Sequence, residues 1–209
     1  MWTLVAVATI FLVLVFAEYL SRYKGIHSEL TRKIVHVLVG TFVAFWPFFL
    51  SWRTIEYLSL AFVAVVLFSM KFNIFAAVHA VSRHTSGELL FALVIGVLAL
   101  IATTKWVFAA AMLNLSLADG MAAIVGLGWG ENFRYKVLGH SKSYAGSLAF
   151  FFTSCLIMLW YAAFSHAAYT ALTVLWLPLF ATVAENLAIN GTDNLVIPLL
   201  FALVLTSSL

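Results

Sequence analysis

Charged residues are scarce in this chain: Lys, Arg, Asp and Glu together make up 9% of its 209 residues, whereas 65% are hydrophobic. A mean hydropathy of +1.09 excludes an ordinary soluble domain and predicts an integral membrane protein. The single cysteine, Cys155, lies in an apolar run, which excludes a disulfide framework and a thiolate metal site. The net charge of +3 requires no nucleic-acid partner.

No linker or shift in composition marks a second domain, so residues 1–209 are expected to form one transmembrane domain. About twenty apolar residues cross a bilayer as a helix, and shorter runs suffice where polar flanks reach the interface. This criterion predicts an all-α bundle of about eight transmembrane helices, near residues 2–20, 34–50, 54–71, 89–103, 105–127, 147–164, 168–190 and 193–208. The fourth run is short and its turn into the fifth is tight, so seven spans are the alternative.

The first apolar run has no basic region before it, which favours an uncleaved anchor with the N-terminus outside. In that orientation the outer face carries only two basic residues, Arg53 and Lys105. The cytoplasmic side carries nine, namely Arg22, Lys24, Arg32, Lys33, Lys71, Arg83, Arg134, Lys136 and Lys142. This bias supports an even number of spans. We expect a multi-pass protein of a prokaryotic cell membrane, with its polar site facing the cytoplasm.

Three polar segments interrupt the apolar sequence, at residues 28–36, 119–146 and 185–198. Ionisable side chains at membrane depth are costly and usually mark a functional site. Transporters usually carry such groups at the midplane, in two similar halves, and this sequence has no internal repeat. A polar site at the cytoplasmic boundary therefore favours an enzyme that joins a lipid to a soluble substrate.

In the first polar segment, chemically active residues recur at steps of three and four, so they share one face of a helix. They are Glu29, Arg32 or Lys33, His36 and Gly40. Adjacent Arg and Lys can bind phosphate, and a glycine permits close approach of another helix. A positive-inside anchor with a buried histidine is the alternative, but the depth of His36 in the membrane favours a functional role.

Residues 71–88 carry His79, Arg83 and His84. Their first half, residues 72–78, is amphipathic and predicts an interfacial helix. The five-residue spacing places the two histidines poorly for a zinc site on one helix face. We expect either a loop that contacts substrate or a solvated loop.

The second polar segment combines a carboxylate near a helix end with a glycine-rich loop, which contains the predicted cytoplasmic loop at 128–146 and holds serines and a lysine. Asp119 precedes Gly126, Gly128, Gly139, Ser141, Lys142, Ser143 and Gly146. This combination fits magnesium–nucleotide chemistry, because glycines let backbone amides approach phosphate, Lys142 would neutralise it and Asp119 would hold the metal. A helix opening near Ser147 would direct more amides at the same anion. The Walker A motif is absent.

The third polar segment is partly explained by helix capping. Gly191 suits a C-cap and Asp193 suits an N-cap. Glu185, about two turns inside the seventh predicted span, is left unexplained. A buried carboxylate needs a partner, and a metal or a cationic side chain from another polar segment is the natural candidate.

Together these segments resemble the CTP-dependent polyprenol kinase family, which includes dolichol kinases, phytol kinases and CTP-dependent diacylglycerol kinases. The resemblance lies in four motifs in order: ELTRKIVH at 29–36 with Gly40, ADGMAAIVG at 118–126, GHSKSYAGSLA at 139–149 and ENLAINGTDNLVIP at 185–198. It implies transfer of the γ-phosphate of CTP to the hydroxyl of a lipid alcohol, with Mg²⁺ or another divalent cation. The residues Tyr144 and Ala145 depart from the family pattern, which leaves the identity of the alcohol open.

The resemblance and the residue chemistry give one set of expected roles. Catalysis is assigned to Asp119, Lys142, His36 and Arg32. Metal binding is assigned to Asp119, Glu185 and Asp193. Nucleotide binding is assigned to Lys33, Gly126, Gly128, Gly139, Ser141, Ser143, Gly146 and Asn194.

Two other functions remain open from the sequence. One is a cytidylyltransferase that uses CTP on a phospholipid and releases pyrophosphate, although the Asp-rich signature of those enzymes is absent. The other is a non-enzymatic lipid carrier or flippase. The base that accepts the alcohol proton is His36 or a carboxylate.

Overall fold

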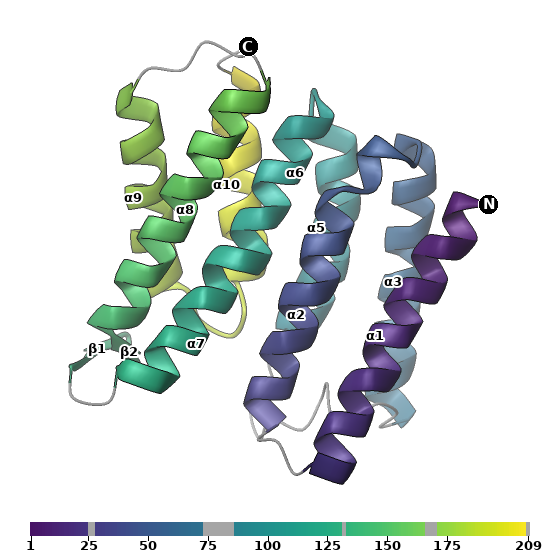
Figure 1. Cartoon of the computed structure of the whole chain (residues 1–209), viewed down its shortest axis with the longest axis horizontal. Coiled ribbons are helices and arrows are strands. Elements are labelled where there is room, and N and C mark those ends of the chain that lie inside the picture. The colour runs from purple at the N-terminus through teal and green to yellow at the C-terminus, as the bar shows by residue number, and fades with distance from the viewer. Residues whose placement is uncertain (25–27, 73–85, 131–132, 166–170, 208–209) are drawn as a thin grey trace.

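The computed structural model describes residues 1–24, 28–72, 86–130, 133–165 and 171–207, most of which lie in helices. The helices are α1 (Trp2–Lys24), α2 (Ser28–Ala44), α3 (Trp52–Phe72), α5 (Gly87–Ile101), α6 (Lys105–Leu113), α7 (Asp119–Trp129), α8 (Tyr144–Ser165), α9 (Ala171–Leu187) and α10 (Asp193–Ser207). They run side by side as one bundle, with both termini at the end opposite a short hairpin (Figure 1). Apart from Phe72, which ends α3, the predicted interfacial helix at 72–78 and its neighbours His79, Arg83 and His84 lie outside the described residues.

Within the described ranges, four helical stretches are long and apolar enough to cross a membrane. They are α1, α3, α8 and the stretch Lys105–Trp129, while α5, α9 and α10 are apolar but shorter. A helix overlaps each predicted span, so the helical bundle is confirmed. How many of these helices cross the bilayer, and which end faces the cytoplasm, stay predictions.

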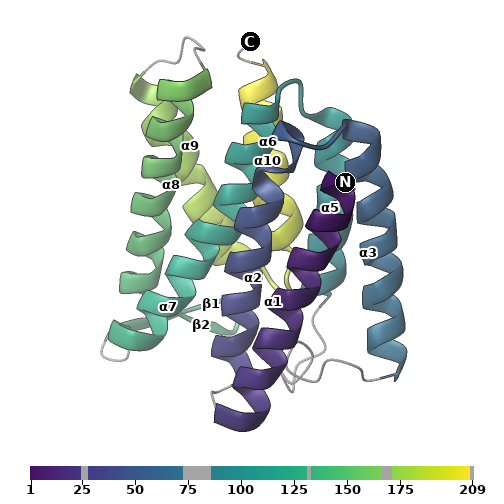
Figure 2. The ribbon, with the colours of Figure 1, turned by 45° about the vertical axis from the view of Figure 1, so that its right-hand side comes forward.

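The stretch Lys105–Trp129 is the centre of the bundle, and 72% of its 18-residue apolar window is buried. It packs against α2, α8 and α10, and Figure 2 shows α6 among these neighbours. Its middle is a π-helical turn, η2 (Asn114–Ala118), immediately before Asp119. In this turn the side chains of Asn114 and Ser116 donate to the carbonyl oxygens of Ala110 and Met112, each at 2.9 Å. A π turn adds a residue and rotates the side chains that follow it about the helix axis.

The second predicted span was placed too late in the sequence. We expected residues 34–50, but α2 covers Ser28–Ala44 and is followed by a 3₁₀ turn, η1 (Trp46–Phe48). Pro47 explains the end, because proline has no N–H and disfavours α-helical geometry in the residue before it. The earlier start places the whole first polar segment on α2.

The structure contains a β-hairpin that the expected all-α architecture did not include. Strands β1 (Arg134–Val137) and β2 (His140–Ser143) pair antiparallel, with Tyr135 opposite Lys142. The turn residues Leu138 and Gly139 have φ of 48° and 83°. Positive φ at both positions is typical of the two-residue turn that joins paired strands. The predicted loop at 128–146 is therefore the end of α7, the hairpin and the start of α8.

The α2 helix crosses the central helix at two glycines. A Cβ on Gly40 would lie 2.5 Å from Ser116 Cβ, and a Cβ on Gly120 would lie 2.1 Å from Val37 Cγ2. Neither distance is tolerated, so only glycine permits this approach. The predicted role of Gly40 in close helix packing is confirmed, and the crossing brings the polar face of α2 to Asp119.

Candidate active site

A cavity of about 390 Å³ lies at the hairpin end of the bundle. Twelve of the predicted site residues line it, namely Arg32, Lys33, His36, Asp119, Gly126, Ser141, Lys142, Ser143, Gly146, Glu185, Asp193 and Asn194. The other two, Gly128 and Gly139, do not, and nothing lies within 4 Å of a Cβ built on either. Four segments that are far apart in the sequence thus meet at one site.

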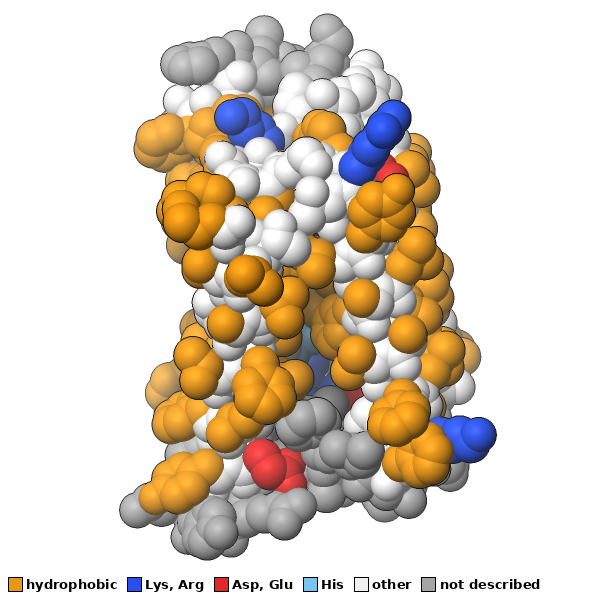
Figure 3. All heavy atoms as spheres, turned by 90° about the vertical axis from the view of Figure 1, so that its right-hand side faces the viewer, with side chains coloured by type: hydrophobic (Ala, Val, Ile, Leu, Met, Phe, Trp, Pro, Cys, Tyr) orange, Lys and Arg blue, Asp and Glu red, His pale blue; other side chains and the backbone are white. Residues whose placement is uncertain are grey.

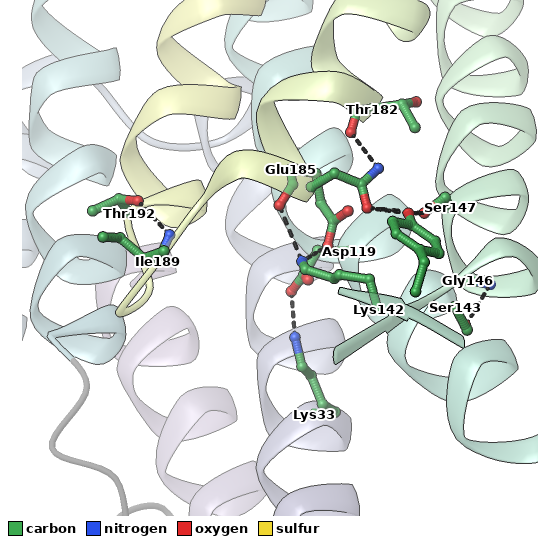
Figure 4. A network of polar contacts seen from close by, with 12 residues as sticks. Lys33, Asp119, Lys142, Ser143, Gly146, Ser147, Thr182, Glu185, Ile189 and Thr192 are labelled. Atoms are coloured by element: carbon green, nitrogen blue, oxygen red, sulfur yellow. Dashed lines mark hydrogen bonds and ion pairs between the residues drawn. The ribbon is translucent and has the colours of Figure 1, made fainter. Parts of the chain in front are cut away.

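The first charged pair joins α2 to the start of α7. Lys33 Nζ donates a hydrogen bond to Asp119 Oδ2 at 2.7 Å (Figure 4). The two side chains are 12% and 6% exposed. Desolvation offsets most of the attraction within so buried a pair, so it is a weak source of stability. A gain in stability therefore does not explain why Lys33 and Asp119 are buried beside the cavity.

His36 lies about one turn along α2 from Lys33. Its Nε2 is 2.9 Å from the carbonyl oxygen of Leu115 and 3.4 Å from Asp119 Oδ2. Because a carbonyl oxygen only accepts, the contact assigns the proton of a neutral ring to Nε2 and leaves the lone pair on Nδ1. The ring also packs against Phe91, with centroids 4.9 Å apart. His36 therefore stands between charged and apolar surroundings.

The second charged pair joins the hairpin to α9. Lys142 Nζ donates to Glu185 Oε1 at 2.5 Å and to the carbonyl oxygen of Glu185 at 3.0 Å. The Glu185 side chain is 7% exposed and that of Lys142 is 23% exposed. The prediction that Glu185 takes a cationic partner from another polar segment is confirmed. Both charged pairs line the same cavity.

Tyr135 is a residue at this site that the sequence reasoning missed. Its hydroxyl lies 2.6 Å from Ser147 Oγ and donates to Asn186 Oδ1 at 2.5 Å. Since Tyr135 faces Lys142 across the hairpin and Asn186 follows Glu185, the hairpin is fixed to α9 at two adjacent residues. Residues 134–137 alternate between charged and apolar side chains, but the turn pair Leu138-Gly139 is not a preferred hairpin sequence, so the sequence signal for this strand is too short to predict it.

Ser143, Gly126 and Gly146 line the cavity, but they lie in regular elements and not in one loop. Ser143 ends β2, Gly126 lies in α7 and Gly146 lies in α8. Ser143 Oγ accepts the N–H of Gly146 at 3.0 Å and so caps the start of α8. A Cβ on Gly146 would lie 2.8 Å from the carbonyl oxygen of Ala122, so glycine is needed where α7 meets α8. The expected glycine-rich loop is wrong in this respect, because α7 continues past Gly126 to Trp129.

Asp193 and Asn194 begin α10 at the edge of the cavity. Asn194 Nδ2 donates to the carbonyl oxygen of Gly87 at 2.7 Å, which ties α10 to the start of α5. Gly191, with φ of 84°, approaches the same place, since a Cβ there would lie 2.7 Å from the Gly87 nitrogen. The loop before α10 is thus held in place by backbone contacts with α5.

Three carboxylates face the cavity, those of Asp119, Glu185 and Asp193. Among the described residues, no three His, Cys, Asp or Glu side chains form a ready metal centre. Mg²⁺ usually binds through one or two carboxylates together with substrate phosphates and water, so a complete protein cage is not required. The residues present fit a metal ion that arrives with a phosphate ligand.

The structure defines a class of protein: a bundle of helices, several of them apolar and long enough to cross a membrane, with a charged cavity at one end. The chain is 33% identical to the phytol kinase of Synechocystis sp. over 218 residues, covering 98% of this chain and 91% of that protein. It is 30% identical to a probable chloroplastic phytol kinase of Zea mays over 226 residues, covering 92% of this chain and 71% of that protein. The chain therefore belongs to the polyprenol and phytol kinase family, as its four motifs predicted. No family model and no solved structure matches it.

Proposed function

We propose that this protein is a membrane-embedded kinase that transfers the γ-phosphate of CTP to the hydroxyl of a prenyl alcohol, with phytol as the first candidate. One observation carries the proposal: two lysine–carboxylate pairs from four separate segments line a single cavity. Phosphoryl transfer requires positioning and charge neutralisation more than covalent help from the protein. The names of the two relatives support a kinase over a lipid carrier.

The two lysines are the groups that neutralise the nucleotide phosphates. In the structure each ammonium group is held by a carboxylate, Lys33 by Asp119 and Lys142 by Glu185. Phosphate oxygens compete for the same ammonium protons, so a bound nucleotide would draw the lysines away from these carboxylates. Arg32 lines the same cavity and adds a third positive charge from α2.

The released carboxylates are the expected metal ligands. Asp119, with Glu185 or Asp193, would hold Mg²⁺, which neutralises charge on the β- and γ-phosphate oxygens when bound. In such an exchange Asp119 and Glu185 would pass from a lysine to the metal ion, so that neither buried charge is left without a partner.

The alcohol is activated by removal of its proton. The alcohol oxygen attacks the γ-phosphorus, the bond from that phosphorus to the bridging oxygen breaks, and CDP and a prenyl monophosphate leave. We assign the proton to His36 Nδ1, because Nε2 is committed to the Leu115 carbonyl oxygen. The Asp119 carboxylate at 3.4 Å would stabilise the imidazolium that forms.

The test is to incubate purified protein in detergent with γ-labelled CTP or ATP, Mg²⁺ and a panel of phytol, a polyprenol and diacylglycerol. We expect label in phytyl monophosphate, CDP as the second product, and poor transfer from ATP. Release of pyrophosphate would instead indicate a cytidylyltransferase. Absence of transfer from either nucleotide to any of the alcohols would refute the kinase proposal.

A further inference from the structure

A second cavity, of about 80 Å³, lies beside the charged one. Most of its wall is apolar, from Val35 and Val39 on α2, Phe62 and Val65 on α3, and Phe91 on α5. Ile10 and Leu14 of α1 add to this apolar lining. We call this space the α1–α3 groove. None of the apolar side chains that line it belongs to the charged cavity.

The α1–α3 groove and the charged cavity share one wall. Arg32, His36 and Asn194 line both spaces. From His36 an aromatic path leads into the groove, because its ring packs on Phe91 at 4.9 Å and Phe91 packs on Phe62 at 6.2 Å. A molecule with a polar end at His36 would therefore have its apolar part in the groove.

The groove opens to the side of the bundle. α1 packs on α2 and α3 packs on α5, so α1 and α3 stand on either side of the opening. Figure 3 shows this face: two columns of apolar side chains flank a hollow, and charged side chains are visible deep in its lower part. α1 and α3 are both long enough to span a membrane and bury only 11% and 22% of their apolar windows inside the protein. Such a face lies against lipid, so the opening faces the bilayer and not water.

We infer that the α1–α3 groove binds the single isoprenoid chain of the acceptor and presents its hydroxyl to His36. This inference rests on the proposed function and names the substrate class of the same site. The acceptor enters from the bilayer between α1 and α3, while the nucleotide occupies the charged cavity from the other side of the shared wall. A space of 80 Å³ is small beside ordinary ligand pockets, so it holds only the part of one hydrocarbon chain that is nearest the hydroxyl. The rest of the chain would extend between α1 and α3 into the bilayer, and the groove leaves no room for a second chain.

The first test measures binding without requiring turnover. Full-length protein in nanodiscs is irradiated with a prenyl alcohol that carries a diazirine near the end of its chain, and labelled peptides are mapped by mass spectrometry. We expect label on α1 and α3, with competition by unlabelled phytol and little competition by dioleoylglycerol. Label confined to α8 and α9 would refute the groove, and equal competition by dioleoylglycerol would refute its preference for a single chain.

The second test fills the groove with a large side chain and compares that variant with a matched control. Val65 and Leu67 lie two residues apart on α3 and are both 50% exposed, but only Val65 lines the groove. Val65→Trp should raise the KM for phytol about tenfold, whereas Leu67→Trp should leave it within about twofold of wild type. Equal KM values in the two variants would refute the inference while the kinase proposal stood. If CTP supports no transfer at all, the kinase proposal fails and the labelling pattern alone decides the groove.

Discussion

The ammonium groups of Lys33 and Lys142 each donate a hydrogen bond to a carboxylate that lies far away in the sequence, 86 residues in one case and 43 in the other. Buried ion pairs are poor stabilisers compared with apolar packing, because both charges lose their hydration. Removing only one partner is costly, since it leaves the other charge buried and unpaired. A single substitution in either pair therefore mixes a loss of stability with a loss of function, and the two effects need separate measurements.

The first mutational prediction separates these effects at Asp119. Asp119→Asn should lower kcat more than tenfold, which corresponds to more than about 1.4 kcal/mol, and should also lower thermal stability because Lys33 loses its charge partner. The double variant Lys33→Met, Asp119→Asn should regain stability in detergent but remain inactive. Turnover and unfolding temperature are measured on the same preparations. A double variant with more than about a tenth of wild-type kcat would show that Asp119 is not needed for the chemistry.

At the scale of elements, three local features decide where the site residues point. The π turn η2 sets the rotation of α7 and with it the direction of Asp119. The hairpin places Lys142 and Tyr135 side by side against α9. Glycines at the crossing of α2 with the central helix set how closely Lys33 and His36 approach Asp119.

The second mutational prediction tests the crossing of α2 with the central helix. Gly120→Ala should destabilise the protein by about 1–3 kcal/mol, because the new Cβ would lie 2.1 Å from Val37 Cγ2 and valine has little freedom to rotate in a helix. Adding Val37→Ala should restore most of that stability, since the next nearest atom is 3.6 Å away. The measurement is the midpoint of thermal unfolding in detergent.

Gly128→Ala is the matched control, because nothing lies within 4 Å of a Cβ at that position on the same helix. It should be as stable as wild type. If Gly120→Ala is equally stable, or if Val37→Ala brings no recovery, the close crossing is not a constraint on the fold.

At the scale of the whole molecule, the two ends of the bundle correspond to the two sides of the membrane that the basic residues predicted. Both termini lie at one end of the bundle, and the hairpin lies at the other (Figure 1). Arg53 and Lys105, the two basic residues assigned to the outer face, lie at the starts of α3 and α6. The charged cavity lies at the hairpin end, where most basic residues were expected. An even number of crossings with the site on the cytoplasmic side is the topology that agrees with this arrangement.

The topological prediction is tested by cysteine accessibility in a Cys155→Ser background. An impermeant maleimide added outside intact cells should label Arg53→Cys and should not label Arg134→Cys until the membrane is opened. Both variants should expose their thiols in detergent, which serves as the labelling control. Labelling of both positions from the outside, or of Arg134→Cys alone, would contradict the predicted orientation.

The sequence by itself determined the helical bundle, the family and most of the residues that line the charged cavity. Apolar runs and ordered motifs are local properties, so they can be read without knowing which helices touch. Only the tertiary structure decided which charges pair, because the partners of Lys33 and Lys142 depend on how closely separate helices cross. It also decided the hairpin, the π turn and the place of Gly128 and Gly139 outside the site. Those features follow from backbone hydrogen bonding and from packing at glycines, and neither is fixed by the hydrophobic pattern.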